Sequence, residues 1–193
     1  MGNRASEMVR QAVEATVTDN IELAQHVVTA DDEVDKLERE VTEKTVITVM
    51  REAPVAQDLR FLISTIGVVG EIEKTADKAV KLARRAIKLT GRFPGEMKLP
   101  LQTLGEMART SFSSALRLYV DFDLSLAEEV VHSDEAIDKA YTQVRSQLTA
   151  LIQQDSSQTE HLIRTMDAFH TLEHVADYAV AIAVRVWMIN APR

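Results

Sequence analysis

The feature that most constrains this chain is an acidic pattern that occurs twice, 100 positions apart, inside stretches with helical apolar spacing. Glu73 and Asp77 are separated by three residues, and so are Glu173 and Asp177. Apolar residues at steps of three and four surround each glutamate, which places it on the seam of an amphipathic helix. An ionised carboxylate in such a seam must be paired, protonated or bound to a cation, because burying it alone is costly. These acids are therefore the leading candidates for a functional site.

The residues upstream of these acids repeat as well, at an offset of 103 positions. Residues 23–36 and 126–139 share a leucine-alanine pair, two consecutive valines and two aspartates at equal spacing. The repeated aspartates are Asp31 and Asp35 in the first copy and Asp134 and Asp138 in the second. A repeat of this length indicates two copies of one structural unit.

Apolar periodicity and chain-breaking residues predict six helices and no strand. The expected helices cover residues 5–28, 31–53, 54–89, 101–131, 134–153 and 159–189. Residues 90–100 contain two of the six glycines and two of the four prolines, which is typical of a linker. We therefore predict an all-α fold of two tandem three-helix bundles, related by the internal repeat and covering residues 1–92 and 99–193. Gly67 and Gly70 lie inside an expected helix, where they indicate either a close helix contact or a bend.

The expected turns indicate which acids face each other. In an antiparallel hairpin, residues equidistant from the turn lie at the same level if both helices rise equally per residue. Asp35 and Glu73, like Asp31 and Asp77, are equidistant from the proline that separates their helices. The corresponding pairs of the second copy are equidistant from the turn at residues 155–156. Four carboxylates are thus expected at one level in each unit, where a metal ion would offset their repulsion.

Ligation by carboxylates, without cysteine, favours hard or borderline cations. We expect divalent or trivalent ions, namely iron, Mn or Mg ahead of Zn. The predicted ligands are Asp31, Asp35, Glu73, Asp77, Asp134, Asp138, Glu173 and Asp177. The alternative is a structural helical bundle without bound metal, in which Asp31 and Asp134 cap helices and the other aspartates lie on a solvated rim beside lysines or arginines.

A second motif overlaps the later acids. His170, Glu173 and His174 form the H-x-x-E-H pattern of inverted zinc peptidases, in which two histidines bind zinc and the glutamate acts as a base. The first copy has Gly70 and Lys74 at the two histidine positions. One interpretation of the motif is therefore a metal-dependent hydrolase. Another is that a histidine adds a nitrogen ligand to the second acidic site, which would give the two sites unequal metal preference. Because the chain has no phosphate-binding glycine loop and no G-x-S-x-G motif, we expect a protein that is not an enzyme.

The composition of the chain indicates which classes of partner and which cell compartment to expect. A net charge of −8 argues against nucleic-acid binding, which requires a basic surface. The absence of cysteine excludes disulfides and fits a cytoplasmic protein. Residues 179–189 form the longest apolar run, but it is short and contains Arg185, so no membrane span is expected.

Five short motifs, taken together, resemble a known family. They are Asp-x-x-Val-Asp at 31–35, Pro-Val-Ala-x-Asp-Leu-Arg at 54–60, Ile-Glu-x-x-Ala-Asp at 72–77, Asp-x-x-Ile-Asp at 134–138 and Leu-Glu-x-x-Ala-Asp at 172–177. This set resembles the PhoU family of phosphate-uptake regulators over nearly the whole chain. The resemblance implies two three-helix bundles, metal bound by paired E(D)-x-x-x-D motifs, and a cytoplasmic negative regulator of phosphate uptake and phosphate-starvation signalling.

The resemblance also implies partners and residue roles. The implied partners are the ATPase of the phosphate ABC transporter and a sensor histidine kinase; the membrane is reached only through the transporter, and a homo-oligomer is left open. Asp58 and Arg60 would support the turn between the second and third helices or join a partner surface. One departure stands out: the family usually has Arg-Ile-Gly between the glutamate and the aspartate, whereas this chain has a triplet starting at Lys74 in one copy and at His174 in the other.

Overall fold

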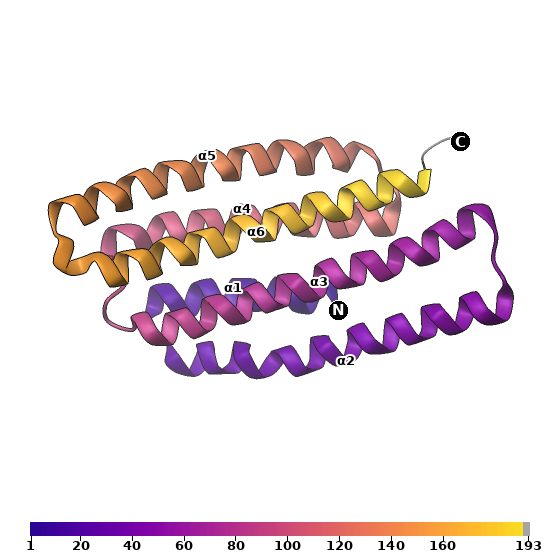
Figure 1. The fold of residues 1–193 in the computed structure, drawn as a ribbon, viewed down its shortest axis with the longest axis horizontal. Helices are drawn as coiled ribbons and strands as arrows, with labels where there is room; N and C mark the ends of the chain where they lie inside the picture. Colours follow the sequence, from indigo (N-terminus) through magenta and orange to yellow (C-terminus); the bar gives the residue numbers. More distant parts are fainter. Residues whose placement is uncertain (191–193) are drawn as a thin grey trace.

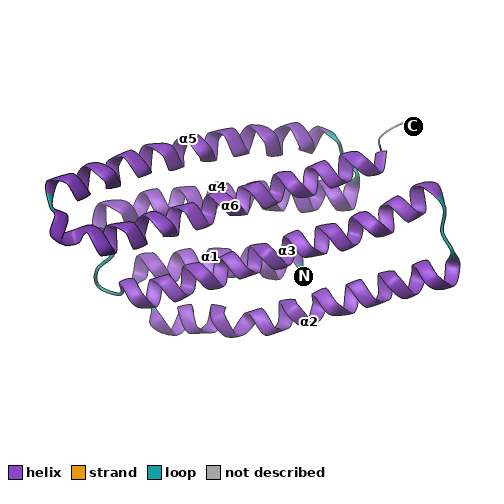
Figure 2. Cartoon of the chain, in the orientation of Figure 1, coloured by secondary structure: helices purple, strands orange, loops and turns teal. Residues whose placement is uncertain are grey.

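The computed structural model describes residues 1–190, which form six α-helices and one short 3-10 helix without any strand in that range (Figure 1). The helices are α1 (Gly2–Thr18), α2 (Ile21–Glu52), α3 (Ala56–Leu89), α4 (Gly95–Asp121), α5 (Ser125–Gln154), η1 (Ser156–Gln158) and α6 (Thr159–Asn190). Helices account for nearly all of the described chain, and loops are confined to short connections (Figure 2). The predicted all-α fold is confirmed.

The helices form two bundles, α1–α3 and α4–α6, that lie side by side (Figure 1). In each bundle the last two helices form a long antiparallel hairpin, α2 with α3 and α5 with α6. α3 packs along α6, and α1 packs along α4, so a single hydrophobic core runs through both bundles. The unit boundaries proposed at residues 92 and 99 stay a prediction, and residues 191–193 lie outside the described residues.

The predicted boundary between the first two helices was wrong. The chain breaks at Asp19, whose positive φ of 55° ends α1, and not near the acidic cluster at residues 31–33. Asn20 then begins α2, because its side-chain oxygen accepts a hydrogen bond from the Leu23 N–H at 3.0 Å. α2 continues through Asp31 because the buried positions of its apolar stripe continue on both sides of that residue.

The same error occurs in the second copy. α4 ends before Phe122, which has a φ of 54°, and α5 begins at Ser125 and not near residue 134. Asp134, like Asp31, therefore lies inside a helix and is not a cap. This position removes the helix-capping explanation for both aspartates.

Two prolines also lie at positions other than those expected. Pro54 was predicted to open the third helix, but it lies in the connection and α3 begins at Ala56. Pro100 was predicted to precede the fourth helix, but it lies in the second turn of α4. There it removes the backbone hydrogen bond that position 100 would otherwise donate to the Glu96 carbonyl.

No helix within residues 1–190 is both long enough and apolar enough to cross a membrane.

Candidate functional site

The first set of acids joins the two helices of the α2–α3 hairpin. Asp31 and Asp35 come from α2, and Glu73 and Asp77 come from α3. Burial raises the pKa of Glu73, and repulsion from Asp77 and Asp35 adds to this shift. Burial also raises the pKa of Asp31, with further contributions from Asp35 and Asp77. Acids from both helices therefore act on each other, as the hairpin register predicted.

A pocket of about 250 Å³ opens at this first set, lined by Asp35, Glu38, Arg39 and Glu73. Glu38 is a fifth carboxylate, and its charge also raises the pKa of Glu73. The internal repeat gives no signal for Glu38, because Tyr141 occupies the corresponding position in the second copy. A weaker signal was available, since Glu38 follows Asp35 by three residues and therefore shares its helix face.

The second set joins the α5–α6 hairpin in the same way. Asp134 and Asp138 come from α5, and Glu173 and Asp177 come from α6. Burial raises the pKa of Glu173; repulsion from Asp177 adds to the shift, and His174 opposes it. Burial likewise raises the pKa of Asp134, together with repulsion from Asp138 and Asp177. The structure thus brings together both predicted groups of four acids.

Two carboxylate oxygens of the second set lack a hydrogen-bond donor among the described residues. Asp134 Oδ1 and Glu173 Oε2 are buried and have no hydrogen-bond partner. A buried polar atom without a partner is destabilising, and such atoms are uncommon in folded proteins. A cation would satisfy both oxygens, so this donor set fits the metal that the sequence analysis predicted.

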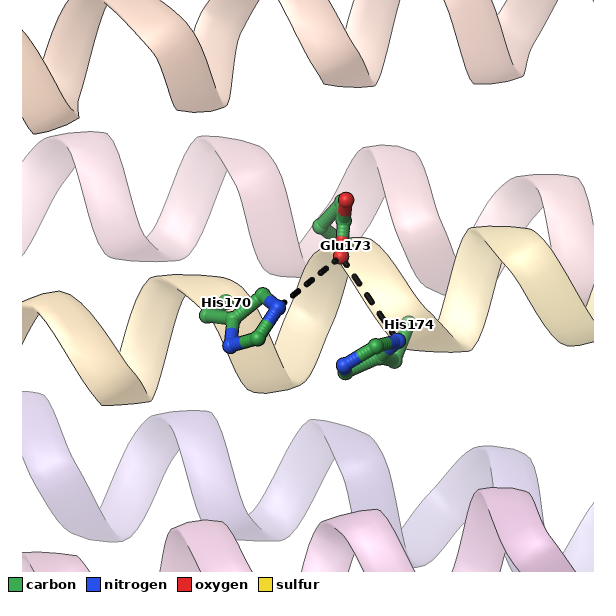
Figure 3. A group of neighbouring side chains, drawn as sticks. All are labelled: His170, Glu173 and His174. Carbon is green, nitrogen blue, oxygen red and sulfur yellow. Dashed lines mark ion pairs between the residues drawn. The ribbon is translucent and has the colours of Figure 1, made fainter.

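The histidines of the H-x-x-E-H motif flank Glu173 on one face of α6 (Figure 3). Glu173 Oε2 lies 3.8 Å from His170 Nε2 and 3.7 Å from His174 Nδ1. His174 Nδ1 also lies 3.0 Å from Asp177 Oδ2. One ligand atom from each of the three motif residues lies within 4.8 Å of the others. The motif therefore places two nitrogen donors beside the second set of acids.

Aromatic rings hold the two imidazoles in place. Tyr141 of α5 stacks on His170 with ring centroids 5.7 Å apart, and Tyr178 stacks on His174 at 6.4 Å. Burial lowers the pKa of His170, and the positive charge of His174 adds to this effect. A lowered pKa keeps the His170 ring neutral, which is the form that binds metal.

Cationic side chains of α3 face this second set across the contact between the bundles. Lys74 and Lys78 each lie 5.8 Å from the centre of the Tyr178 ring. Burial lowers the pKa of Lys78, whereas Glu173 and Asp177 oppose that shift. The second set therefore lies close to the bundle interface.

Asp58 lies in the first turn of α3, where an acid interacts favourably with the helix dipole. Its predicted role with Arg60, in supporting the turn or meeting a partner, stays a prediction.

Comparisons with known proteins identify relatives that span both bundles. Residues 1–86 and 101–186 each match the PhoU domain family. A phosphate-specific transport system accessory protein PhoU homolog from Rhizobium meliloti is 28% identical over 188 residues, which cover 97% of this chain and 79% of that protein. A homolog of the same name from Pseudomonas aeruginosa is 31% identical over 185 residues, 95% of this chain and 76% of its own length.

Solved structures show the same architecture. The crystal structure of PhoU from Pseudomonas aeruginosa matches with a TM-score of 0.93 at 30% identity, covering 98% of this chain and 91% of that chain. The phosphate transport system regulatory protein PhoU from Streptococcus pneumoniae matches with a TM-score of 0.89 at 20% identity, covering 98% and 89%. At that lower identity the second match supports the fold alone.

Proposed function

The chain belongs to the PhoU family, and from this membership we propose that it is a metal-binding regulator of phosphate uptake and not an enzyme. Its relatives are named accessory proteins of the phosphate-specific transport system. The observation that carries the metal-binding part is the doubled group of four carboxylates, one group on each hairpin. In the second group, two buried oxygens lack any described donor.

The residues of each group would hold a cation between two helices. A bound divalent or trivalent ion would supply the positive charge that four neighbouring acids otherwise lack. In the first hairpin, Asp31 and Asp35 would bind from α2, while Glu73 and Asp77 would bind from α3. Binding would tie the two helices together at this level and favour the ionised form of acids whose pKa values burial raises.

The regulatory part of the proposal concerns partners. We propose that the chain lies in the cytoplasm and restrains phosphate uptake through the ATPase of the phosphate ABC transporter, and restrains phosphate-starvation signalling through a sensor histidine kinase. It would reach the membrane only through the transporter. The names of the relatives support the link to phosphate transport, since both refer to that transport system.

The test is recovery of the transporter ATPase and the kinase on immobilised chain, with metal and after chelation. We expect both partners on the native chain with metal. Weaker recovery is expected from a variant with Glu73, Asp77, Glu173 and Asp177 changed to Ala. The matched control changes four exposed acids outside the two groups, Glu22, Glu43, Glu52 and Asp121, and should behave as the native chain does. Failure of the native chain to recover either partner would contradict the regulatory proposal.

A further inference from the structure

We infer that the two acidic sites bind different classes of metal: the α6 site takes a borderline transition ion such as Zn²⁺ through His170, Glu173 and His174, and the α2–α3 site takes a hard cation such as Mn²⁺ through carboxylates alone. This inference rests on the proposed metal-binding function and specifies the ligand of each site.

The geometry of the three side chains is close to that of a zinc site. Zn–N and Zn–O bonds of about 2.0–2.2 Å place neighbouring ligand atoms of a tetrahedral site roughly 3.3–3.5 Å apart. Glu173 Oε2 lies 3.7 Å from His174 Nδ1 and 3.8 Å from His170 Nε2. Both Glu173 distances exceed this spacing by a few tenths of an ångström, and one nitrogen of each imidazole lies within 4.8 Å of the other. Rotation of the two rings toward each other would therefore bring all three ligands to one ion.

The ligand atom at the centre of this group, Glu173 Oε2, has no hydrogen-bond partner among the described residues. This oxygen is buried, and both imidazoles face it (Figure 3). Asp177 Oδ2, at 3.0 Å from His174 Nδ1, accepts the proton of that nitrogen when no metal is bound, and it offers a fourth ligand once an ion replaces the proton. Stacking of Tyr141 on His170 and of Tyr178 on His174 restricts both rings, so little side-chain freedom is lost on binding.

The first site has no nitrogen donor of this kind. Gly70 occupies the position that corresponds to His170, and Lys74 occupies the position that corresponds to His174. The Lys74 ammonium donates to Glu71 at 3.2 Å, and a protonated amine cannot bind a metal. Imidazole favours zinc, copper, iron and nickel, whereas carboxylates favour magnesium, calcium and manganese. The same fold therefore presents two sites of different selectivity.

The first test titrates chelator-stripped chain separately with Zn²⁺ and with Mn²⁺. The pair His170→Ala and His174→Ala should weaken zinc binding at least about 100-fold, because loss of supporting residues alone weakens metal affinity by about 10–100-fold. Manganese binding at the first site should not change. The matched control, His26→Ala with His132→Ala, removes two exposed histidines elsewhere and should leave both metals bound. With Co²⁺ as a substitute ion, the visible absorption of a nitrogen-ligated site should disappear only in the first pair.

The second test builds the motif into the first site with Gly70→His and Lys74→His. A Cβ added at Gly70 meets nothing within 4 Å, so the new side chain can start there without a clash. Arg185, which lies 2.8 Å from Glu71, keeps that buried acid paired when Lys74 is replaced. This variant should bind a second equivalent of zinc tightly.

The outcomes separate the inference from the function on which it rests. Zinc affinity that is the same with and without His170 and His174 would overturn the inference while leaving the carboxylate sites in place. Absence of both zinc and manganese binding in the native chain would overturn the metal-binding proposal as well.

Discussion

At the scale of single residues, Glu173 is a carboxylate that the fold buries without a described hydrogen-bond donor for one of its oxygens. Its side chain is only 20% exposed, and burial raises its pKa. Without metal, the ionised form of this acid is therefore disfavoured by the fold. Burial of this oxygen should favour metal binding, because the oxygen does not have to lose bound water before it contacts the ion.

We predict that Glu173→Gln stabilises the metal-free protein at neutral pH. The substitution keeps the shape of the side chain and removes one of four neighbouring charges, so the gain should be about 0.2–0.5 kcal/mol for each like-charge pair removed, as for acids four residues apart on a helix. Urea unfolding in the presence of chelator measures this difference. In saturating zinc the order should reverse, because the amide is a poorer ligand. A variant that is less stable than the native chain in chelator would contradict the account.

The raised pKa values also predict how stability changes with pH. Asp31, Glu73, Asp134 and Glu173 bind protons more tightly when folded than when unfolded, since their folded pKa values lie above the ordinary 3.8 for Asp and 4.5 for Glu. These groups should therefore make the metal-free protein less stable as pH rises from those ordinary values through the raised ones. The destabilisation is complete above the raised values.

The measurement compares native chain with a Glu73→Gln, Glu173→Gln variant in chelator between pH 4 and 7. Subtraction of the two curves removes the contributions of titrating groups far from the two sites. The native chain should lose more stability than the variant as pH rises, and saturating Mn²⁺ together with Zn²⁺, which fill the two sites, should remove that extra loss. Parallel curves would show that the fold does not raise the pKa values of Glu73 and Glu173.

At the scale of helices, the contact between α3 and α6 includes an ion pair that crosses from one bundle to the other. Glu71 is only 4% exposed and pairs with Arg185 at 2.8 Å. Gly67 makes room for this pair, because a Cβ at that position would overlap the Arg185 guanidinium. Gly70, one turn further along α3, has no such neighbour.

The two glycines therefore predict different responses to alanine. Gly70→Ala should stabilise the protein by about 0.5–1 kcal/mol, because alanine restricts the unfolded chain and favours helix. Gly67→Ala should stabilise it less or destabilise it, because the same helix gain is opposed by displacement of Arg185, which leaves the buried Glu71 with Lys74 as its remaining cation. Urea unfolding of both variants gives the comparison, and equal stabilisation of both would show that Arg185 is not held where the structure places it.

These helices show which features the sequence could predict. The hairpin register followed from spacing, because helices rise equally per residue, and it correctly brought acids such as Asp35 and Glu73 together. The helix starts did not follow, because the acidic cluster at 31–33 looked like a start while Asn20 was the actual cap. The pair of Glu71 with Arg185 could not be predicted, since it depends on how two bundles pack and not on any local period. Gly67 indicated either a close helix contact or a bend, and the contact that it allows is with the Arg185 side chain.

At the scale of the whole molecule, duplication has produced two similar hairpins with different sites. The hairpins lie side by side through α3 and α6, within one continuous core (Figure 1). Each carries its four acids on two facing helices, yet Glu38 adds a carboxylate to the first group and two histidines accompany the second. Metal binding at either site would therefore act on the same helix pair that joins the bundles.

The measurement that tests metal binding most directly is elemental analysis of protein purified without chelator. Stoichiometric metal is expected in the native chain and in the control variant with Glu22, Glu43, Glu52 and Asp121 changed to Ala. A still-helical variant with Glu73, Asp77, Glu173 and Asp177 changed to Ala should have lost that metal. If native protein lacks metal, or if the quadruple site variant retains it, the two groups of acids are not metal sites.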